Sequence, residues 1–447
     1  MEKKNFYNNL KTIAIPITIQ SLFQAILSLI DEVMIGNLGT ASIAGVGLSI
    51  KFTSLFSVVM SAIVTVAGIL IAQYKGNDDE RGMCISFFSN LYLLLGICVL
   101  FIFFAVIFPE QIMSLYSKDM NTIHQSAVYL RIVVVGFIPQ IFVLMISTLL
   151  RNLDAAKKLM YASLVSVITN TIFNYLLING IGFIPRMGIM GAATATCLAR
   201  VVELLFVWGI YKRVSKKTGF KLAHMKDVSF EFMKKIGIIL APILISEFLW
   251  SLGDNVYAVI YGHLGTTACA AMTVTYPIQG LAIGALSGVA AASGIIVGAS
   301  LGAKDEEKAY LDASRILRLT VISGIVISIV IALVAHLYVL VYNVEPDVRK
   351  NAIYILYAYT LVFCGKVINM VLGGGILRSG GQTQYTMMIV IGATWFVGVP
   401  LGLVTAYTFH WPIYIVYFAL SLEEYVRVAF KVKLFRSRKW MNNLAID

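Results

Sequence analysis

The sequence is short of charged residues. Asp, Glu, Lys and Arg make up 13% of its 447 residues, and 59% of the residues are hydrophobic. A soluble domain carries roughly 25% charged residues. Apolar runs of about 20 residues recur along the chain, and this is the length that an α-helix needs to cross a bilayer. The composition therefore predicts an all-α integral membrane protein, and the long unbroken runs argue against a barrel of short alternating strands.

Cysteine patterns and nucleotide-binding motifs are also missing. The five cysteines are scattered and form no CxxC or zinc-type spacing, so we expect neither a disulfide nor a metal cluster. The chain has no P-loop of the form GxxxxGK[ST] and no HExxH signature, so we expect neither ATP-driven transport nor an enzyme. We expect no organic cofactor, and a proton or a sodium ion is the coupling ion to consider.

The basic residues are unevenly placed. The net charge is +12 and the pI about 9.3, which could suggest nucleic acid. The Lys and Arg residues instead gather before the first apolar run, in alternate short loops and in the tail, as the positive-inside rule requires. We therefore expect no nucleic-acid partner, a multi-pass protein of the inner (plasma) membrane in contact with lipids, and both termini in the cytoplasm.

The apolar runs indicate twelve transmembrane helices. Their predicted ranges are 12–36, 47–74, 84–108, 125–150, 158–184, 189–212, 235–261, 272–300, 314–341, 350–377, 384–407 and 411–431.

The chain repeats itself at an offset of 226 residues. Pro16 falls on Pro242, and the stretch Gly76–Glu80 falls on Gly302–Glu306; later, Leu150-Arg151 falls on Leu377-Arg378 at an offset of 227. Because six helices return the chain to its starting side, the halves have the same topology. We expect two six-helix bundles related by a pseudo-twofold along the membrane normal. The predicted parts are an amino-terminal bundle (1–212), a cytoplasmic linker (213–234), a carboxyl-terminal bundle (235–431) and a basic cytoplasmic tail (432–447).

Several motifs, in order, carry a family resemblance. They are Pro16 followed by Asp31–Gly39, then Gly76–Asp79, Asn170–Asn174, Gly188–Thr196, Leu377–Thr383 and the tail Glu424–Trp440. Together, over essentially the whole chain, they resemble the multidrug and toxic compound extrusion (MATE) transporters.

This resemblance implies a secondary active antiporter that works by alternating access of its two bundles. Such a transporter exports small organic cations or amphipathic drugs and metabolites in exchange for protons or sodium ions. We expect it to act as a monomer. The alternative is a flippase for a lipid-linked saccharide from the same superfamily, and a non-transporting membrane scaffold is a third hypothesis.

Asp31 is the first candidate for ion coupling. It lies inside the first predicted span, where a charge costs roughly 2.5–3.5 kcal/mol on insertion scales and is a functional candidate by default. Burial favours its neutral acid and a nearby cation favours its carboxylate, so Asp31 can take up and release a proton or sodium. The alternative is a structural Asp bonded to a neighbouring helix.

Asn170 and Asn174 are the second candidates. They lie one helical turn apart and so share a face, and amide oxygens can ligate a hard cation such as a possible sodium ion at Asp31, Asn170 and Asn174. In the family this spacing belongs to the coupling site beside the first-helix Asp. The second position is often Asp there, so Asn174 removes a negative charge and favours protons. Helix-packing amides are the alternative.

The seventh span carries two carboxylates and the tenth a lysine. Glu247 and Asp254 lie two turns apart on one helix face, and Lys366 needs a partner or water. Two readings stay open: Glu247 or Asp254 forms a buried pair with Lys366, or these charges line the substrate cavity. The i, i+3 pairs Arg200–Glu203 and Glu424–Arg427 are expected to be structural. The substrate-cavity candidates are Gln24, Glu247, Trp250, Asp254, Tyr257, Gln279 and Lys366.

Overall fold

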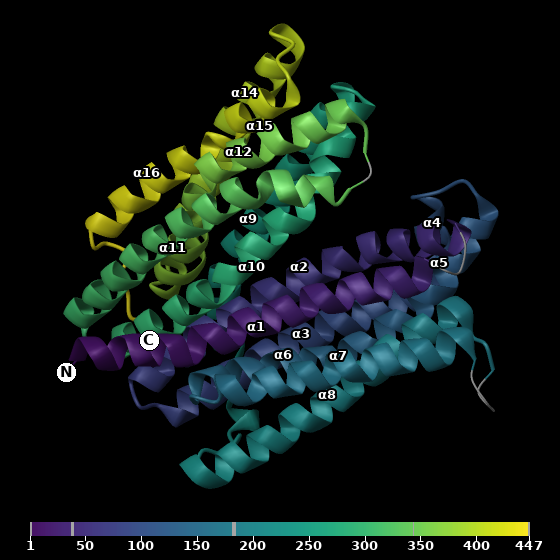
Figure 1. Ribbon diagram of the computed structural model, residues 1–447. Coiled ribbons are helices and arrows are strands. Elements are labelled where there is room, and N and C mark those ends of the chain that lie inside the picture. The colour runs from purple at the N-terminus through teal and green to yellow at the C-terminus, as the bar shows by residue number, and fades with distance from the viewer. Residues whose placement is uncertain (1, 37–39, 181–184, 343, 446–447) are drawn as a thin grey trace. The chain divides into compact units, whose positions relative to one another are not determined.

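The computed structural model describes residues 2–36, 40–180, 185–342 and 344–445, and the regular structure of these residues is all helical (Figure 1). Residues 37–39, which belong to the first family motif, lie outside the described residues. The predicted all-α class is confirmed.

The helices of the amino-terminal half follow the predicted spans closely. They are α1 (Glu2–Gly36), α2 (Thr40–Gly76), α3 (Glu80–Ile107), α4 (Pro109–Ser114), α5 (Met120–Val133), the 3-10 turn η1 (Val134–Gly136), α6 (Phe137–Asn152), α7 (Ala156–Asn179) and α8 (Gly188–Thr218).

The carboxyl-terminal half is more broken. After the 3-10 turn η2 (Met225–Asp227) come α9 (Phe230–His263), α10 (Thr266–Gly302), α11 (Glu306–Leu340), α12 (Pro346–Ile368), η3 (Asn369–Leu377), α13 (Thr383–Ala393), η4 (Thr394–Gly398), α14 (Val399–Leu403), η5 (Val404–Thr408), α15 (Ile413–Ser421) and α16 (Glu423–Arg436).

Within the described residues, 11 helical stretches are long and apolar enough to cross a membrane. The twelfth predicted span, 411–431, coincides with α15 and α16. These two helices have 9 and 14 residues and meet at Leu422, so each alone is shorter than a full crossing.

The sequence repeat reappears as matching structure. Asp79 caps the amino end of α3 and Asp305 caps α11, and in each case the carboxylate accepts the backbone N–H three residues on, at 2.8 and 3.0 Å. The residues just before them, Asp78 and Lys304, both have positive φ, 54° and 60°. The duplicated motif is therefore a helix-capping turn in both halves.

The chain packs into two compact units. Unit 1 contains Met1–Thr18, Ala72–Asp78 and Ile238–Asp447; unit 2 contains Ile19–Ile71 and Asp79–Gly237. The start of α1 and the end of α2 thus pack with the carboxyl-terminal helices. In unit 2, α8 packs along α7 and also against α5 and α6; in unit 1, α10, α11 and α12 pack on one another.

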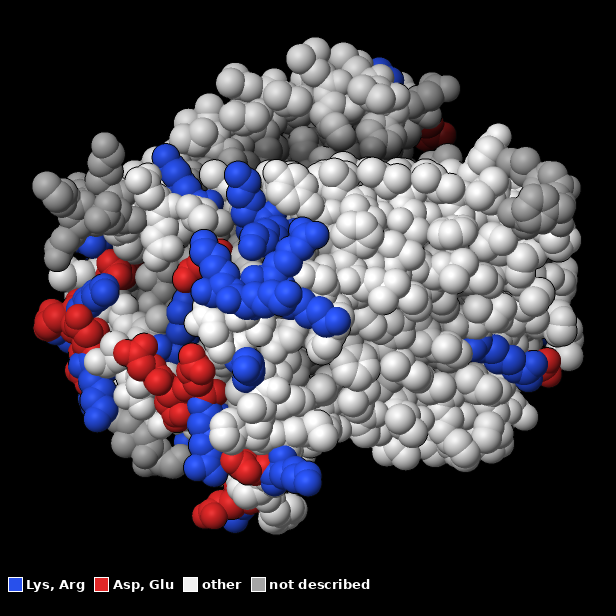
Figure 2. Space-filling model, turned by 90° about the horizontal axis from the view of Figure 1, so that it is seen from below, with Lys and Arg blue, Asp and Glu red and all other residues white. Residues whose placement is uncertain are grey.

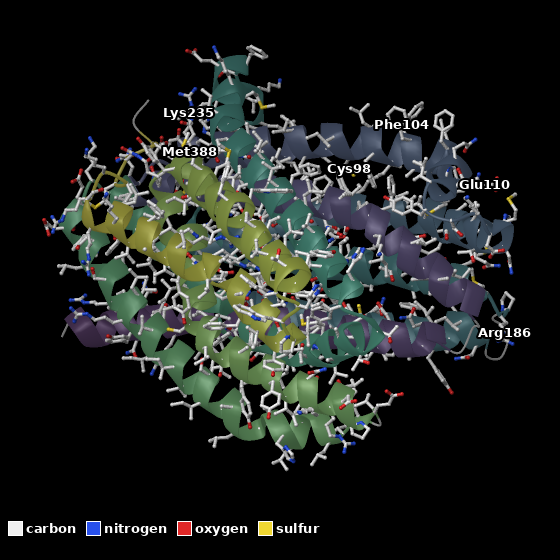
Figure 3. The ribbon with its side chains drawn as sticks, turned by 90° about the horizontal axis from the view of Figure 1, so that it is seen from above. Cys98, Phe104, Glu110, Arg186, Lys235 and Met388 are labelled. Carbon is white, nitrogen blue, oxygen red and sulfur yellow. The ribbon has the colours of Figure 1, made fainter. Side chains whose placement is uncertain are left out.

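The exposed side chains of α3 indicate that these helices contact lipid. Cys98 is fully buried, whereas Phe103 and Phe104 are more than half exposed, at 51% and 54%. Figure 3 shows Cys98 and Phe104 on this helix, with Glu110 beyond its end. Large apolar side chains exposed along a whole helix face are stable in contact with lipid. The protein is a multi-pass membrane protein.

Charged side chains gather at helix ends instead. Lys212, Arg213, Lys216 and Lys217 are exposed in the last turns of α8, where Tyr211 and Val214 are buried. Figure 2 shows blue side chains collected at one end of the face over α7 and α8, beside a broad area without charge.

The residues after α16 are bound into unit 1. Trp440 is fully buried and its indole N–H donates to the Phe435 carbonyl at 3.0 Å. The Gln73 amide, at the end of α2, donates to the Ser379 carbonyl at 2.6 Å and to the Asn442 carbonyl at 3.1 Å. The tail is therefore part of the fold of unit 1.

Candidate ion-coupling site

Three of the predicted residues meet in unit 2. The amide NH2 of Asn174 on α7 donates to the Asp31 carboxylate on α1 at 2.5 Å and to the Asn170 side-chain oxygen at 2.9 Å. Both asparagines are 1% exposed. The one-turn spacing on α7 puts the two amides in line with the carboxylate.

A second layer of polar groups comes from α8. The Asn170 amide donates to the Thr196 hydroxyl at 3.4 Å. One turn further along α8, Arg200 pairs with Glu203 at 2.9 Å, as predicted, and the Ser166 hydroxyl of α7 donates to the same Glu203 carboxylate at 3.0 Å. The guanidinium of Arg200 also attracts Asp31 through space.

One polar atom of this group is left over. The side-chain oxygen of Asn174 is buried and has no hydrogen-bond partner. Its orientation follows from its neighbours, because Asp31 and Asn170 both present oxygen atoms and only the NH2 end of the amide can serve them. An orphan buried acceptor needs a donor or a cation, so the group can accept a proton, a water or a small hard cation.

This site is not a conventional metal centre. Among the described residues, no cluster of three or more His, Cys, Asp or Glu side chains could hold a metal ion. A sodium ion here would have to use the Asp31 carboxylate and the neutral amide and hydroxyl oxygens.

The matching positions in unit 1 hold different chemistry. At an offset of 226, Asp31 falls on Tyr257; at 224, Asn170 and Asn174 fall on Thr394 and Gly398. These positions are again neighbours, because a Cβ atom added to Gly398 would collide with the Tyr257 hydroxyl. The Thr394 hydroxyl accepts a hydrogen bond from Arg427 at 2.5 Å. The repeat is thus kept in space, but the acceptor set is gone.

Helix α16 fills unit 1 with charge instead. Glu423, Glu424, Arg427 and Lys431 are all buried, with 3–6% exposed. Arg427 pairs with Glu423 at 2.9 Å and with Glu424 at 3.6 Å, and the Lys431 ammonium donates to the Asn369 carbonyl at 3.3 Å. The Glu424–Arg427 pair is the predicted one, and Glu423 adds a second carboxylate.

The predicted partner of Lys366 is different in the structure. Lys366 pairs with Glu424 at 3.5 Å, and Glu247 pairs with Arg378 at 2.8 Å. Among the described residues Asp254 forms no ion pair, although it attracts Lys366 through space. The reason is that α16 lies against α12 and supplies a closer carboxylate than α9 does.

The other cavity candidates divide by exposure. Trp250 is 45% exposed and Asp254 is also exposed, whereas Tyr257 is 7% exposed. Gln279 is engaged internally, since it donates to the Thr275 hydroxyl at 2.9 Å and accepts from the Tyr417 hydroxyl at 3.1 Å. Gln24 on α1 is half-buried.

The comparison with known families decides the identity of the fold. The MatE family model matches residues 16–176 and again residues 242–404, so the match covers most of the chain and both copies of the repeat. The chain belongs to the MatE family.

Two relatives of this MatE protein match it over most of their length. It is 22% identical over 434 residues to the uncharacterized transporter YisQ of Bacillus subtilis, covering 95% of this chain and 93% of the relative. It is 23% identical over 402 residues to the multidrug resistance protein NorM of Burkholderia vietnamiensis, covering 87% and 85%.

Solved structures share the whole fold. An outward-facing multidrug resistance MATE family transporter superimposes with a TM-score of 0.86 at 19% identity, covering 96% of each chain. A transporter of the MOP superfamily from Pyrococcus furiosus gives 0.85 at 20% identity, covering 96% of this chain and 95% of the other.

Sequence reasoning about this MatE chain missed part of the polar interior. Glu423 and Lys431 were not singled out, although the spacing 423, 424, 427 and 431 places four charged residues on one helix face. The sequence shows that the pairs Arg200–Glu203 and Glu424–Arg427 correspond at an offset of 224. Nothing in the sequence indicates that this face of α16 is buried.

Proposed function

We propose that this transporter is a secondary antiporter that exports organic cations or amphipathic compounds in exchange for protons, with sodium as the alternative coupling ion. The coupling residue is Asp31. The observation that carries the proposal is the contact between the Asp31 carboxylate and Asn174, which is buried and holds an unpaired side-chain oxygen.

The balance of charges supports a proton. The Asn174 NH2 group donates both hydrogens, one to Asp31 and one to Asn170. A donor group therefore occupies the position where a bound sodium ion would need an oxygen ligand. A proton needs no such shell, because it binds to one carboxylate oxygen. Neutralising Asp31 releases it from Arg200 and Asn174, and this change in α1 contacts is a means to favour one transport state over another.

The exposed residues of α9 support a cationic cargo. Asp254 carries an exposed negative charge, and Trp250, one turn away, presents an exposed aromatic face. A carboxylate beside an aromatic ring is the arrangement that attracts organic cations. In this proposal the protein lies in the plasma membrane with both termini in the cytoplasm, as its loop charges favour.

The test is efflux of ethidium from reconstituted vesicles under an imposed proton gradient or an imposed sodium gradient. Wild type should respond to the proton gradient, and Asp31→Asn should not respond to either. Asp254→Asn is the matched control, because it also removes one carboxylate; it should weaken ethidium transport but keep the response to the proton gradient.

Two outcomes would change the proposal. A response to sodium alone would make the amide and hydroxyl oxygens beside Asp31 a sodium shell. An absence of gradient-driven efflux for a range of organic cations would remove the multidrug function and favour a lipid-linked substrate.

A further inference from the structure

One face of α8 changes from apolar to basic along its length. The face is formed by residues that are three or four positions apart and therefore lie in one stripe along the helix. All of its side chains are exposed, whereas the opposite face of α8 is buried. The residues of the stripe, in order, are Val201, Leu205, Trp208, Lys212 and Lys216.

The order of these side chains matches the layers of a membrane. Val201 and Leu205 suit the hydrocarbon of a bilayer, and the ring of Trp208 suits the interface with water. Lys212 and Lys216 follow about 6 Å and about 12 Å beyond Trp208 along the helix axis, at 1.5 Å per residue. The headgroup region of one leaflet is about 5–8 Å thick, and long lysine side chains can reach back toward it. Both ammonium groups can therefore contact the phosphates of one leaflet.

The end of α8 is held in a fixed conformation. The helix stops at Gly219, which has a φ of 80° and donates its N–H to the Ser215 carbonyl at 2.9 Å. The chain then folds back, because the Leu222 N–H donates to the Tyr211 hydroxyl at 2.8 Å. The Tyr211 ring packs in turn against Trp208, with ring centroids 5.3 Å apart. The aromatic and basic side chains are therefore presented by an ordered surface.

The segment after α8 combines apolar and basic side chains in the same way. Met225 and Phe230 are 53% and 87% exposed, and Lys226 between them is also exposed. Exposed apolar groups beside cations are unfavourable in water but stable at a membrane surface, where the apolar groups enter the interface. The Asp227 carboxylate pairs with Arg81 at 2.9 Å, so the acidic residue next to Lys226 is neutralised within the fold.

Positive charge is in surplus on this surface. Residues 211–235 contain eight Lys and Arg residues and two acidic residues. In the part of the chain that the structure describes, no ion pair is formed by Lys212, Arg213, Lys216 or Lys217. The basic side chains gather beside a broad area without charge (Figure 2). An anionic lipid complements both parts, because its acyl chains match the uncharged area and its headgroup matches the cations.

We propose that the exposed face of α8, with the segment that follows it, is a binding surface for an anionic phospholipid. The acyl chains lie along Val201 and Leu205, and Trp208 marks the level where they join the headgroup. The headgroup phosphate lies between Lys212 and Lys216. A free anion such as inorganic phosphate matches only the basic half of this surface, so the ligand is a lipid.

The experiment uses the full-length protein in phosphatidylcholine bilayers that contain brominated phosphatidylglycerol, with brominated phosphatidylcholine as the neutral counterpart. Bromine on the acyl chains quenches nearby tryptophan fluorescence, and the difference between wild type and Trp208→Phe isolates the signal of Trp208. The ratio of quenching by the two lipids gives the lipid preference at this surface. Wild type should prefer phosphatidylglycerol by about tenfold or more, since each lysine near an anionic headgroup contributes about fivefold.

Two double variants test the position of the charges. Lys212→Gln with Lys216→Gln should lower the preference by about tenfold and leave quenching by phosphatidylcholine unchanged. Lys157→Gln with Lys158→Gln is the matched control, because it removes two exposed lysines from the first turn of α7 in the same unit. The control should keep the wild-type preference. Because all four side chains are exposed, both variants should keep the melting temperature of wild type.

Several results would overturn the proposal. One is equal quenching by the two lipids in wild type, and another is an unchanged preference in Lys212→Gln with Lys216→Gln. An equal loss in both double variants would indicate a diffuse surface charge. Complete loss of the preference on adding glycerol phosphate at constant ionic strength would make a free anion the ligand. Asp31→Asn should keep the lipid preference while it loses coupled efflux, so this surface and the proposed function fail independently.

Discussion

The two units carry the same helices but solve the problem of buried polarity in different ways. In unit 2 one carboxylate, Asp31, lies against neutral amides and a free acceptor. In unit 1 the same repeat position is Tyr257, and the interior is filled by the ion pairs of Arg427 and Lys366. An incomplete polar group can exchange an ion with its surroundings, whereas a network that contains its own cations has less need of one.

The two units also differ in the backbone conformation of their helices. η3, η4 and η5 of unit 1 are π-helical turns, and each adds a residue to the turn and changes which side chains face inward. In unit 2 the described residues of α7 form a regular helix through Asn170 and Asn174. The offset between the halves is 226 at the first helix, 224 at the inner helices and 227 at the arginines, so small insertions have moved side chains within a conserved framework.

The largest expected effect comes from conservative substitutions of Asp31 and of Tyr257, the residue at the matching position of unit 1. Asp31→Asn should abolish gradient-driven efflux, because it removes the titratable group of unit 2, whereas Tyr257→Phe should keep the ion response. Efflux of a fluorescent organic cation under each gradient measures both. If Tyr257→Phe abolished the ion response as Asp31→Asn does, coupling would involve both units.

Arg427→Met should be the most destabilising change in unit 1. It leaves Glu423 and Glu424 buried with too few cations, and breaking a buried ion pair costs about 3–5 kcal/mol. The free energy of unfolding in mixed micelles gives the number. The matched change in unit 2, Arg200→Met, should cost less, since the Ser166 hydroxyl still serves Glu203 and the Arg200 side chain is already 19% exposed. Equal costs would contradict the assignment of the α16 network as structural.

Gly398→Ala tests the close approach at the position that matches Asn174. The added methyl would collide with the Tyr257 hydroxyl and lie against the Glu423 carboxylate, and overpacking of this kind costs about 1–3 kcal/mol. Gly392→Ala is the control, because a Cβ atom there meets nothing within 4 Å and alanine favours the helix by about 0.5–1 kcal/mol. Similar melting temperatures for the two variants would show that this contact is not tight.

The smallest expected effect is a change of ion preference. Asn174→Asp adds a second carboxylate beside Asp31 and should strengthen sodium binding by about tenfold, because affinity for hard cations rises with ligand charge. Sodium binding by calorimetry, with Asn170→Asp for comparison, measures it. Unchanged sodium affinity would mean that Asn174 faces away from the ion during transport.

Much of the framework was predictable from sequence. The repeat gave the correspondence of Pro16 with Pro242, and the capping turns at Asp79 and Asp305 appear where it placed them. The one-turn spacing of Asn170 and Asn174 predicted a shared face, and the structure puts that face against Asp31. Helical periodicity and family motifs act locally, so they determine such features well.

The partners of the charged residues were not predictable. Lys366 could have met Glu247, Asp254 or Glu424, and only the packing of α16 on α12 selects Glu424. Four charged residues of α16 are buried. Residue type alone predicts the opposite, because charged residues are rarely buried unless they are paired. Pairing across helices depends on rotation of each helix about its axis, and the π-helical turns η3 and η4 alter that rotation in a way that no local pattern shows.

The composition of unit 1 also sets the order in which the protein can be completed during synthesis. Its first segment ends at Thr18, whose hydroxyl donates to the Ala285 carbonyl at 3.3 Å. Its last segment buries Trp440 and binds the end of α2 through Gln73 and Asn442. The start of α1 must therefore wait for helices made much later. Unit 2 can assemble before the last helices of unit 1 have been made, whereas unit 1 needs both early and late segments of the chain.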